Sequence, residues 1–224
     1  MSECVLGYDP GGNAKHGVAL LEVRRSRVVG CRTAILPTVH DVIEWFAREL
    51  PVPGCCPLGI GIDTLTIWGT GRSGWRPADE WLRRQYRRVQ RSVMSPNTLS
   101  GAMSLNGMAV LVALREQWPD LRASETHPKV LYYGLTGNPH NWPRHRRAMC
   151  NWLDDQLGVA VDIERGARDH AWDAALSAWA AWRGFTGAWG FDLHALPQSA
   201  TFPVLAPAGP SFFYWPAISP RRRR

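Results

Sequence analysis

Acidic residues stand where short apolar segments of this 224-residue chain stop. Asp9 ends the segment CVLGYD, Asp63 ends PLGIGID, and Glu125 lies near the end of LRASETHP. The carboxyl ends of central strands line the crevice of an α/β sheet, so three such strands can bring together acids that are far apart in the sequence. One strand-end acid is more often a loop or helix cap, but several coincident positions favour a site.

A helical segment supplies two more acids. In RDHAWDAALSAWAAWRG, Asp169 and Asp173 are four residues apart and therefore share a helical face. Clustered carboxylates require bound cations or raised pKa values, and oxygen ligands suit Mg²⁺ or Mn²⁺. Two such ions about 4 Å apart activate a water and stabilise the leaving oxygen of a phosphodiester. We therefore predict a two-ion site with Asp9, Asp63 and Asp173 as principal ligands and Asp169 and Glu125 as auxiliary residues.

The elements that position these acids follow an α/β pattern. Apolar runs predict two strands within residues 16–36, around a turn at 25–27, besides the three strands that end in acids. Helical spacing is found over residues 39–50, 78–93, 143–159 and 168–184. We predict one domain over residues 1–190, with a helical insertion at about residues 68–118 beside the sheet. Residues 191–224 form a proline- and aromatic-rich extension, expected to be extended and pinned by its aromatic side chains.

Charge and composition set the expected class of protein. The net charge is +7, and the tail Arg221–Arg224 supplies four of these charges. The five cysteines form no CxxC pair, which indicates free thiols in a reducing compartment. The start MSECVLGYD lacks a secretory layout, and no apolar run approaches the roughly 20 residues of a membrane span. We expect a soluble, cytoplasmic protein without a membrane partner; its oligomeric state stays open, a homodimer included.

Arginines form the second candidate surface. Arg83, Arg87 and Arg91 fall on one face of the segment WLRRQYRRVQR, where they could neutralise the phosphates of a nucleic acid. Arg72 and Arg76, in GRSGWRPAD, could orient the same substrate or form structural salt bridges. The alternative for the helix is a solvated arginine face on an arginine-rich protein. A separate set, His140, His145 and Cys150, has irregular spacing, so we predict no structural zinc.

Four segments together resemble a known family: GYDPGG, GIDTLTIWGTGRSGWRPADEWLR, ETHPKVLYYGLTG and DHAWDAALSAW, within residues 4–184. They are similar to the domain of unknown function 429, described as predicted nucleases of the RNase H-like fold. The resemblance implies a mixed five-stranded sheet of order 3-2-1-4-5, flanked by helices, with antiparallel strands one to three. RuvC-type Holliday-junction resolvases share this plan, and their D/H-x-x-D-A pattern matches His170, Asp173 and Ala174. The resemblance thus implies His170 as a metal ligand; whether Asp169 or His170 faces the metal stays open.

These observations predict a divalent-metal-dependent nuclease that uses Mg²⁺ or Mn²⁺, and they leave open whether its substrate is DNA, RNA, a hybrid or a branched junction. Two alternatives remain. One is a catalytically silent RNase H-like module that binds nucleic acid or takes part in assembly, and whose binding would weaken steeply with salt. The other is a phosphoryl-transfer enzyme that acts on small nucleotides with the same metal cluster.

Overall fold

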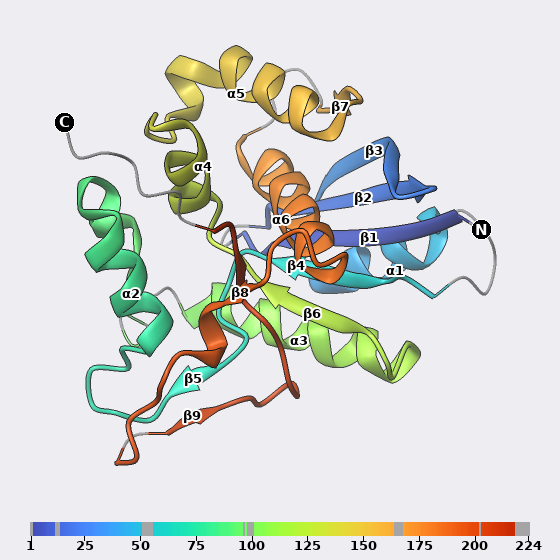
Figure 1. Cartoon of the computed structure of the whole chain (residues 1–224). Helices are drawn as coiled ribbons and strands as arrows, with labels where there is room; N and C mark the ends of the chain where they lie inside the picture. Colours follow the sequence, from blue (N-terminus) through green and yellow to red (C-terminus); the bar gives the residue numbers. More distant parts are fainter. Residues whose placement is uncertain are drawn as a thin grey trace.

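The computed structural model describes residues 2–11, 14–50, 56–95, 97, 101–163, 168–201 and 203–217. The fold is α/β, and its centre is a mixed parallel and antiparallel sheet of six strands with helices on both faces (Figure 1). The strands are β1 (Ser2–Asp9), β2 (His16–Arg24), β3 (Arg27–Leu36), β4 (Gly59–Ile62), β6 (Arg122–Glu125) and β7 (Val161–Asp162). Their order is β6-β4-β1-β2-β3-β7. The prediction of five strands was one too few, because β7 has only two residues and no strand pattern.

The directions of the strands put three carboxyl ends at one edge. β2 runs antiparallel to both β1 and β3, whereas β4 runs parallel to β1, β6 runs parallel to β4, and β7 runs parallel to β3. The predicted turn between β2 and β3 is present, and Arg25 and Ser26 adopt the positive φ angles of 49° and 59° that tight hairpins require. β1, β4 and β6 therefore end on the same side of the molecule.

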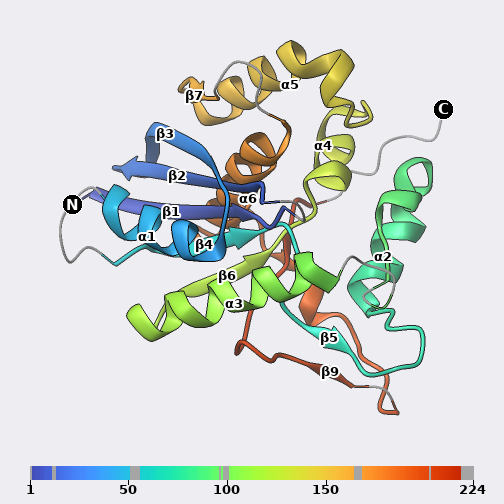
Figure 2. The same ribbon diagram turned by 180° about the vertical axis from the view of Figure 1, so that it is seen from behind.

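Alternating side chains divide the core into two layers. Val5 and Leu21 pack in the layer of α6 (His170–Phe185), α4 (Pro128–Thr136) and α5 (Trp142–Leu157). Leu6 and Leu20 pack in the layer of α1 (Val39–Glu49) and α3 (Gly101–Gln117), which Figure 2 shows from behind. Neighbouring residues of a strand thus serve opposite layers.

Glycines allow α6 to lie directly on the sheet. A Cβ atom added at Gly7, Gly17 or Gly61 would come within 2.1 Å of a backbone carbonyl oxygen of α6. These three glycines lie on the neighbouring strands β1, β2 and β4. The first turn of α6 is thereby held beside the carboxyl ends of β1 and β4.

The predicted insertion follows β4. It contains β5 (Trp68–Gly69), α2 (Pro77–Gln85), a 3₁₀ helix η1 (Arg87–Ser92) and α3. The expected single helix over residues 78–93 is interrupted at Tyr86, which has φ −119° and ψ 57°. The guanidinium of Arg83 donates hydrogen bonds to the carbonyl oxygens of Gln90 and Val93, which fixes the chain as it turns back.

The C-terminal extension packs against the free edge of β6. It forms β8 (Phe191–Asp192), the 3₁₀ helix η3 (Leu193–Ala195), β9 (Val204–Leu205) and β10 (Tyr214–Trp215). Backbone hydrogen bonds join Phe212 to Ala123 and Glu125, and the side chains of Phe213 and Trp215 are buried. The tail Arg221–Arg224 lies outside the described residues. Within the described parts of the chain, none of the helices has the length and apolar character needed to cross a bilayer.

Candidate metal centre

Three aspartates from three elements meet at the carboxyl ends of β1 and β4. Asp9 is the last residue of β1, Asp63 follows β4, and Asp173 lies in the first turn of α6. Each offers a carboxylate oxygen, and the three oxygens lie within 4.8 Å of one another. Asp9 and Asp173 are buried, whereas Asp63 is half-buried. The three predicted principal ligands are therefore brought together.

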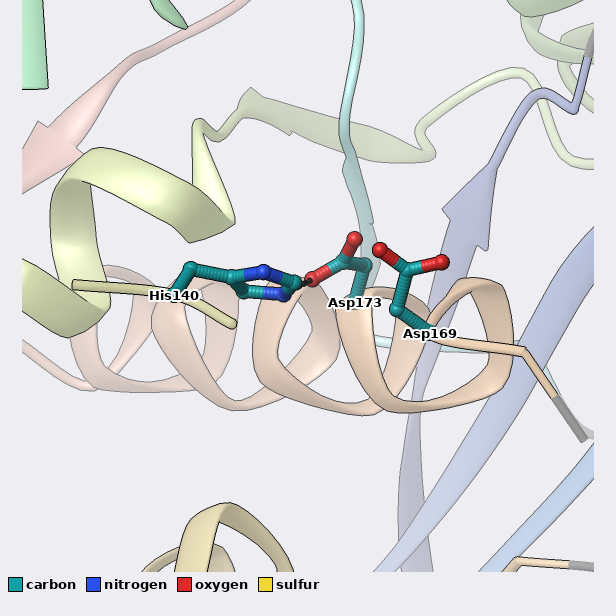
Figure 3. A group of neighbouring side chains, drawn as sticks. All are labelled: His140, Asp169 and Asp173. Carbon is teal, nitrogen blue, oxygen red and sulfur yellow. Dashed lines mark hydrogen bonds and ion pairs between the residues drawn. The ribbon is translucent and has the colours of Figure 1, made fainter. Parts of the chain in front are cut away.

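A second group adjoins the first and shares Asp173. The ligand atoms of His140, Asp169 and Asp173 also lie within 4.8 Å of one another. His140 comes from the connection between α4 and α5, and its Nε2 is 3.1 Å from Oδ1 of Asp173. Figure 3 shows the two aspartates on the same side of α6 with the imidazole directed at Asp173. The edge-to-face contact of His140 with Trp172 orients that ring.

Asp169 and His170 take different positions beside the clustered acids. Asp169 belongs to the second group, whereas His170 lies outside both groups. Nδ1 of His170 is 2.6 Å from Oδ2 of Asp9, so its ring is bonded to a member of the first group. Both residues thus adjoin the acids, and His170 holds the carboxylate of Asp9 through this contact.

Repulsion and burial destabilise the ionised form of this cluster. Burial raises the pKa of Asp9 to about 6, although the hydrogen bond from His170 opposes the shift. Burial, together with Asp9 and Asp173, holds the pKa of Asp63 well above its usual range. Desolvation would lower the pKa of Lys129, but the neighbouring aspartates outweigh it and raise that pKa. Negative charge therefore dominates the site, which a divalent cation would relieve.

Glu125 does not join the clustered aspartates, although the strand-end pattern predicted that it would. In the parallel register, Tyr8, Ile62 and Glu125 lie in one row, whereas Asp9 and Asp63 each come one residue later. Consecutive residues of a strand point to opposite faces, so Glu125 faces away from the two aspartates. It belongs to neither candidate group, which corrects the expectation that it joins the catalytic acids.

Glu125 instead forms a buried ion pair with Arg76. Two guanidinium nitrogens of Arg76 donate to the Glu125 oxygens at 2.8 and 2.6 Å, and Asp79 accepts two further bonds from this side chain at 2.9 and 2.7 Å. Glu125 also accepts a hydrogen bond from the backbone N–H of Thr66. Of the two alternatives for Arg76, the structural salt bridge is therefore present, and a side chain that is only 1% exposed corrects its assignment as a nucleic-acid contact. The pair fixes the start of α2 to the end of β6.

One family matches the chain. Residues 7–191 match the family described as a protein of unknown function, DUF429. The chain belongs to this family. No curated protein and no solved structure shows significant similarity to this DUF429 protein.

The other predicted arginines of the DUF429 protein are at its surface. Arg72, Arg87 and Arg91 are exposed, and the guanidinium of Arg83 lies 4.8 Å from the ring centroid of Trp75. They belong to the loop before α2, to α2 and to η1. Both views place α2 across the molecule from the N-terminus, beyond the carboxyl ends of β1 and β4 (Figures 1 and 2).

Two residues near the acids were not predicted for this site. His140 was considered only as one of several scattered zinc ligands, because nothing in its spacing connects it to residue 173. Lys129 was not considered, although it follows the ETHP segment that the family resemblance includes. Both positions depend on how α4 and the loop after it pack beside α6 (Figure 1).

We expect ionisation of the aspartate cluster to lower the stability of the metal-free protein as the pH rises from about 5 to 7. The native pKa values of Asp9 and Asp63 are raised, so the native state binds more protons than the unfolded state, and the free energy of unfolding falls as they ionise. His170 acts in the same direction, because its native pKa is raised by Asp9 and its proton is lost above that value. Burial lowers the pKa values of His16 and His127, which acts in the opposite direction in the native protein and in Asp9→Asn alike. Thermal melts in chelator across this range should therefore show that the melting temperature of the native protein, relative to that of Asp9→Asn, falls as the pH rises. A difference between the two proteins that does not change with pH would contradict the charge balance described.

Proposed function

We propose that this chain is a divalent-metal-dependent nuclease with an RNase H-like fold. The observation that carries the proposal is the convergence of Asp9, Asp63 and Asp173, whose oxygens lie within 4.8 Å although they come from separate elements. The strand order β3-β2-β1-β4-β6, with the first three antiparallel, supports the fold assignment because the family resemblance implies the same arrangement. β7 is then an addition at one edge.

The donor set fits a pair of divalent ions. Asp9, Asp63 and Asp173 would hold one ion, and His140, Asp169 and Asp173 would hold the other, so that Asp173 is shared. Carboxylate oxygens suit both Mg²⁺ and Mn²⁺. The second group also contains an imidazole, a ligand that Mn²⁺ binds more readily than Mg²⁺ does, so we propose Mn²⁺ for that position. When bound, such ions activate a water and stabilise the oxygen that leaves the phosphorus.

The protein's own side chains would orient and balance this centre. His170 holds the Asp9 carboxylate through its 2.6 Å contact, and Trp172 sets the ring of His140 at the other end. Lys129 contributes a positive charge beside the aspartates, where it would attract a phosphate. The packing of α6 against the glycines of the sheet keeps Asp173 in place between the two groups.

The arginine surface favours a polymer over a mononucleotide. Arg72, Arg83, Arg87 and Arg91 extend over the loop before α2, α2 itself and η1, so they could contact several phosphates in succession. A mononucleotide would reach only a part of this surface. Nucleic acid is therefore the substrate class that we propose.

The test is cleavage of labelled single-stranded and duplex DNA, RNA, a hybrid and a four-way junction, with Mn²⁺, Mg²⁺ or chelator. We expect metal-dependent cleavage that Asp9→Asn reduces by at least about 100-fold, because even residues that only support metal ligands contribute 10- to 100-fold. Asp155→Asn is the matched control, since Asp155 is an exposed acid on α5. Binding without cleavage by the native protein would favour the silent module, and turnover of nucleotides alone would favour phosphoryl transfer.

A further inference from the structure

Two adjacent hollows lie on the surface of the arginine-bearing insertion. The first has a volume of about 530 Å³, and its lining includes Arg72, Trp75, Arg83 and Arg91. The second has a volume of about 560 Å³, and Trp75 and Arg83 also line it, together with Arg84 and Arg87. Both volumes lie within the roughly 300 to 1,000 Å³ of typical small-ligand pockets. The stacked pair of Trp75 and Arg83 is common to the two hollows.

This pair is held in place before any ligand binds. The Arg83 guanidinium lies 4.8 Å from the Trp75 ring centroid. Its Nη1 donates hydrogen bonds of 2.8 and 2.9 Å to the carbonyl oxygens of Gln90 and Val93. Trp75 is half-buried, and its side chain packs against the core layer of α6. A held cation and a held indole therefore line both hollows, and little side-chain entropy is lost when a ligand stacks there.

The lining chemistry suits an anionic ligand with aromatic rings. Five arginines line the two hollows, and Glu80 is the single acid among the lining residues that the structure describes. Glu80 is exposed and faces Arg84 at 3.7 Å, which leaves a strong excess of positive charge. Arginines neutralise phosphates, and a tryptophan face accepts a nucleobase by stacking.

We infer that this pair of hollows, on either side of Trp75 and Arg83, binds consecutive nucleotides of an unpaired nucleic-acid strand. An unpaired base can offer its face to the indole, whereas the bases inside a duplex are stacked on one another. This inference rests on the proposed function, since it names single-stranded nucleic acid as the form that the proposed nuclease binds. The position of α2 beyond the carboxyl ends of β1 and β4 places the hollows at the same end of the sheet as the aspartates (Figure 1).

The test is fluorescence anisotropy in chelator, with a labelled oligothymidylate strand and a blunt duplex of equal length. We expect the strand to bind more tightly than the duplex, and Trp75→Ala to weaken strand binding by about tenfold, the size of one stacked base. The same change should leave duplex binding within about twofold, and Trp75→Phe, which keeps a ring, should restore most of the strand affinity. Equal affinity of strand and duplex, or no effect of Trp75→Ala on the strand, would overturn the inference.

Surface variants keep the test informative even if Trp75→Ala does not fold. Arg91→Gln, in the exposed η1, should lower the salt dependence of strand binding by about 0.7 in log–log slope, as expected for one lost phosphate contact. Arg27→Gln is the matched control, because Arg27 is an exposed arginine at the opposite end of the sheet, and it should change nothing. An Arg91→Gln slope equal to that of the native protein would count against the inference. Because the assay needs no cleavage, its failure leaves the nuclease proposal standing, whereas strand binding without metal-dependent cleavage overturns the nuclease proposal alone.

Discussion

Asp63→Asn is expected to stabilise the metal-free protein while weakening its response to Mn²⁺. The described residues provide no hydrogen bond or ion pair for the Asp63 side chain, and burial, Asp9 and Asp173 raise its pKa well above the usual range. A neutral asparagine removes this buried charge and its repulsion by Asp9 and Asp173. In chelator at about pH 8, where the unfolded chain carries an ionised Asp63, the variant should therefore melt above the native protein.

Addition of Mn²⁺ should reverse the order of the two proteins. A ligand that binds only the native state raises the melting temperature. The native protein should therefore gain more stability than Asp63→Asn, which keeps only the second group of ligands. Asp155→Asn, which changes an exposed acid of α5, should behave like the native protein in both conditions. If Asp63→Asn melts below the native protein in chelator, the carboxylate has a stabilising role that the cluster does not explain.

Gly61→Ala is expected to destabilise the fold and to dismantle the acidic cluster. An added Cβ would lie 2.0 Å from the carbonyl oxygen of Ser177, and it would meet backbone rather than a movable side chain. α6 must then lift from the sheet, at a cost of about 3 kcal/mol or more, the upper part of the range for overpacked cores. For this chain length the melting temperature should fall by about 6–12 °C in a thermal melt.

The same variant should lose most of the stabilisation by Mn²⁺, since displacement of α6 moves Asp173 away from Asp9 and Asp63. Gly30→Ala is the matched control on the same sheet, because its added Cβ would meet only side-chain atoms of Glu22 at 4.0 Å. That control should change the melting temperature by no more than about 2 °C. If Gly61→Ala melts like Gly30→Ala, the close approach of α6 to β4 is not required.

The sequence predicted the site where a local pattern determines the position. Asp9 and Asp63 each lie at the end of a short apolar segment, and Asp173 is one helical turn from Asp169. Strand ends and helical spacing were therefore sufficient to select these residues. Parallel pairing of β1 with β4 then brings the first two acids together. The turn at Arg25 was also readable, because two apolar runs flank a short polar segment.

Other features depended on register and on packing between distant segments. Glu125 is the last residue of β6 and pairs with Ile62, whereas Asp63 comes one residue later. This offset of one residue points the Glu125 side chain to the opposite face of the sheet, and no local sequence pattern encodes it. The sequence around Arg76 did not distinguish it from the exposed arginines. Its ion pair with Glu125, 49 positions further along the chain, nevertheless makes it part of the core. His140 reached the acids through the connection between α4 and α5, whose path the residue types do not specify.

The central claim, that the clustered aspartates bind divalent cations, is tested most directly by calorimetric titration of Mn²⁺ into the native protein and Asp173→Asn. The account predicts that the native chain binds two ions with release of protons, because acids with raised pKa values must ionise to bind metal. Asp173→Asn should bind neither ion tightly, since this residue belongs to both groups. A native protein that takes up no Mn²⁺ at millimolar concentration, or an Asp173→Asn variant that binds as the native protein does, would contradict the claim.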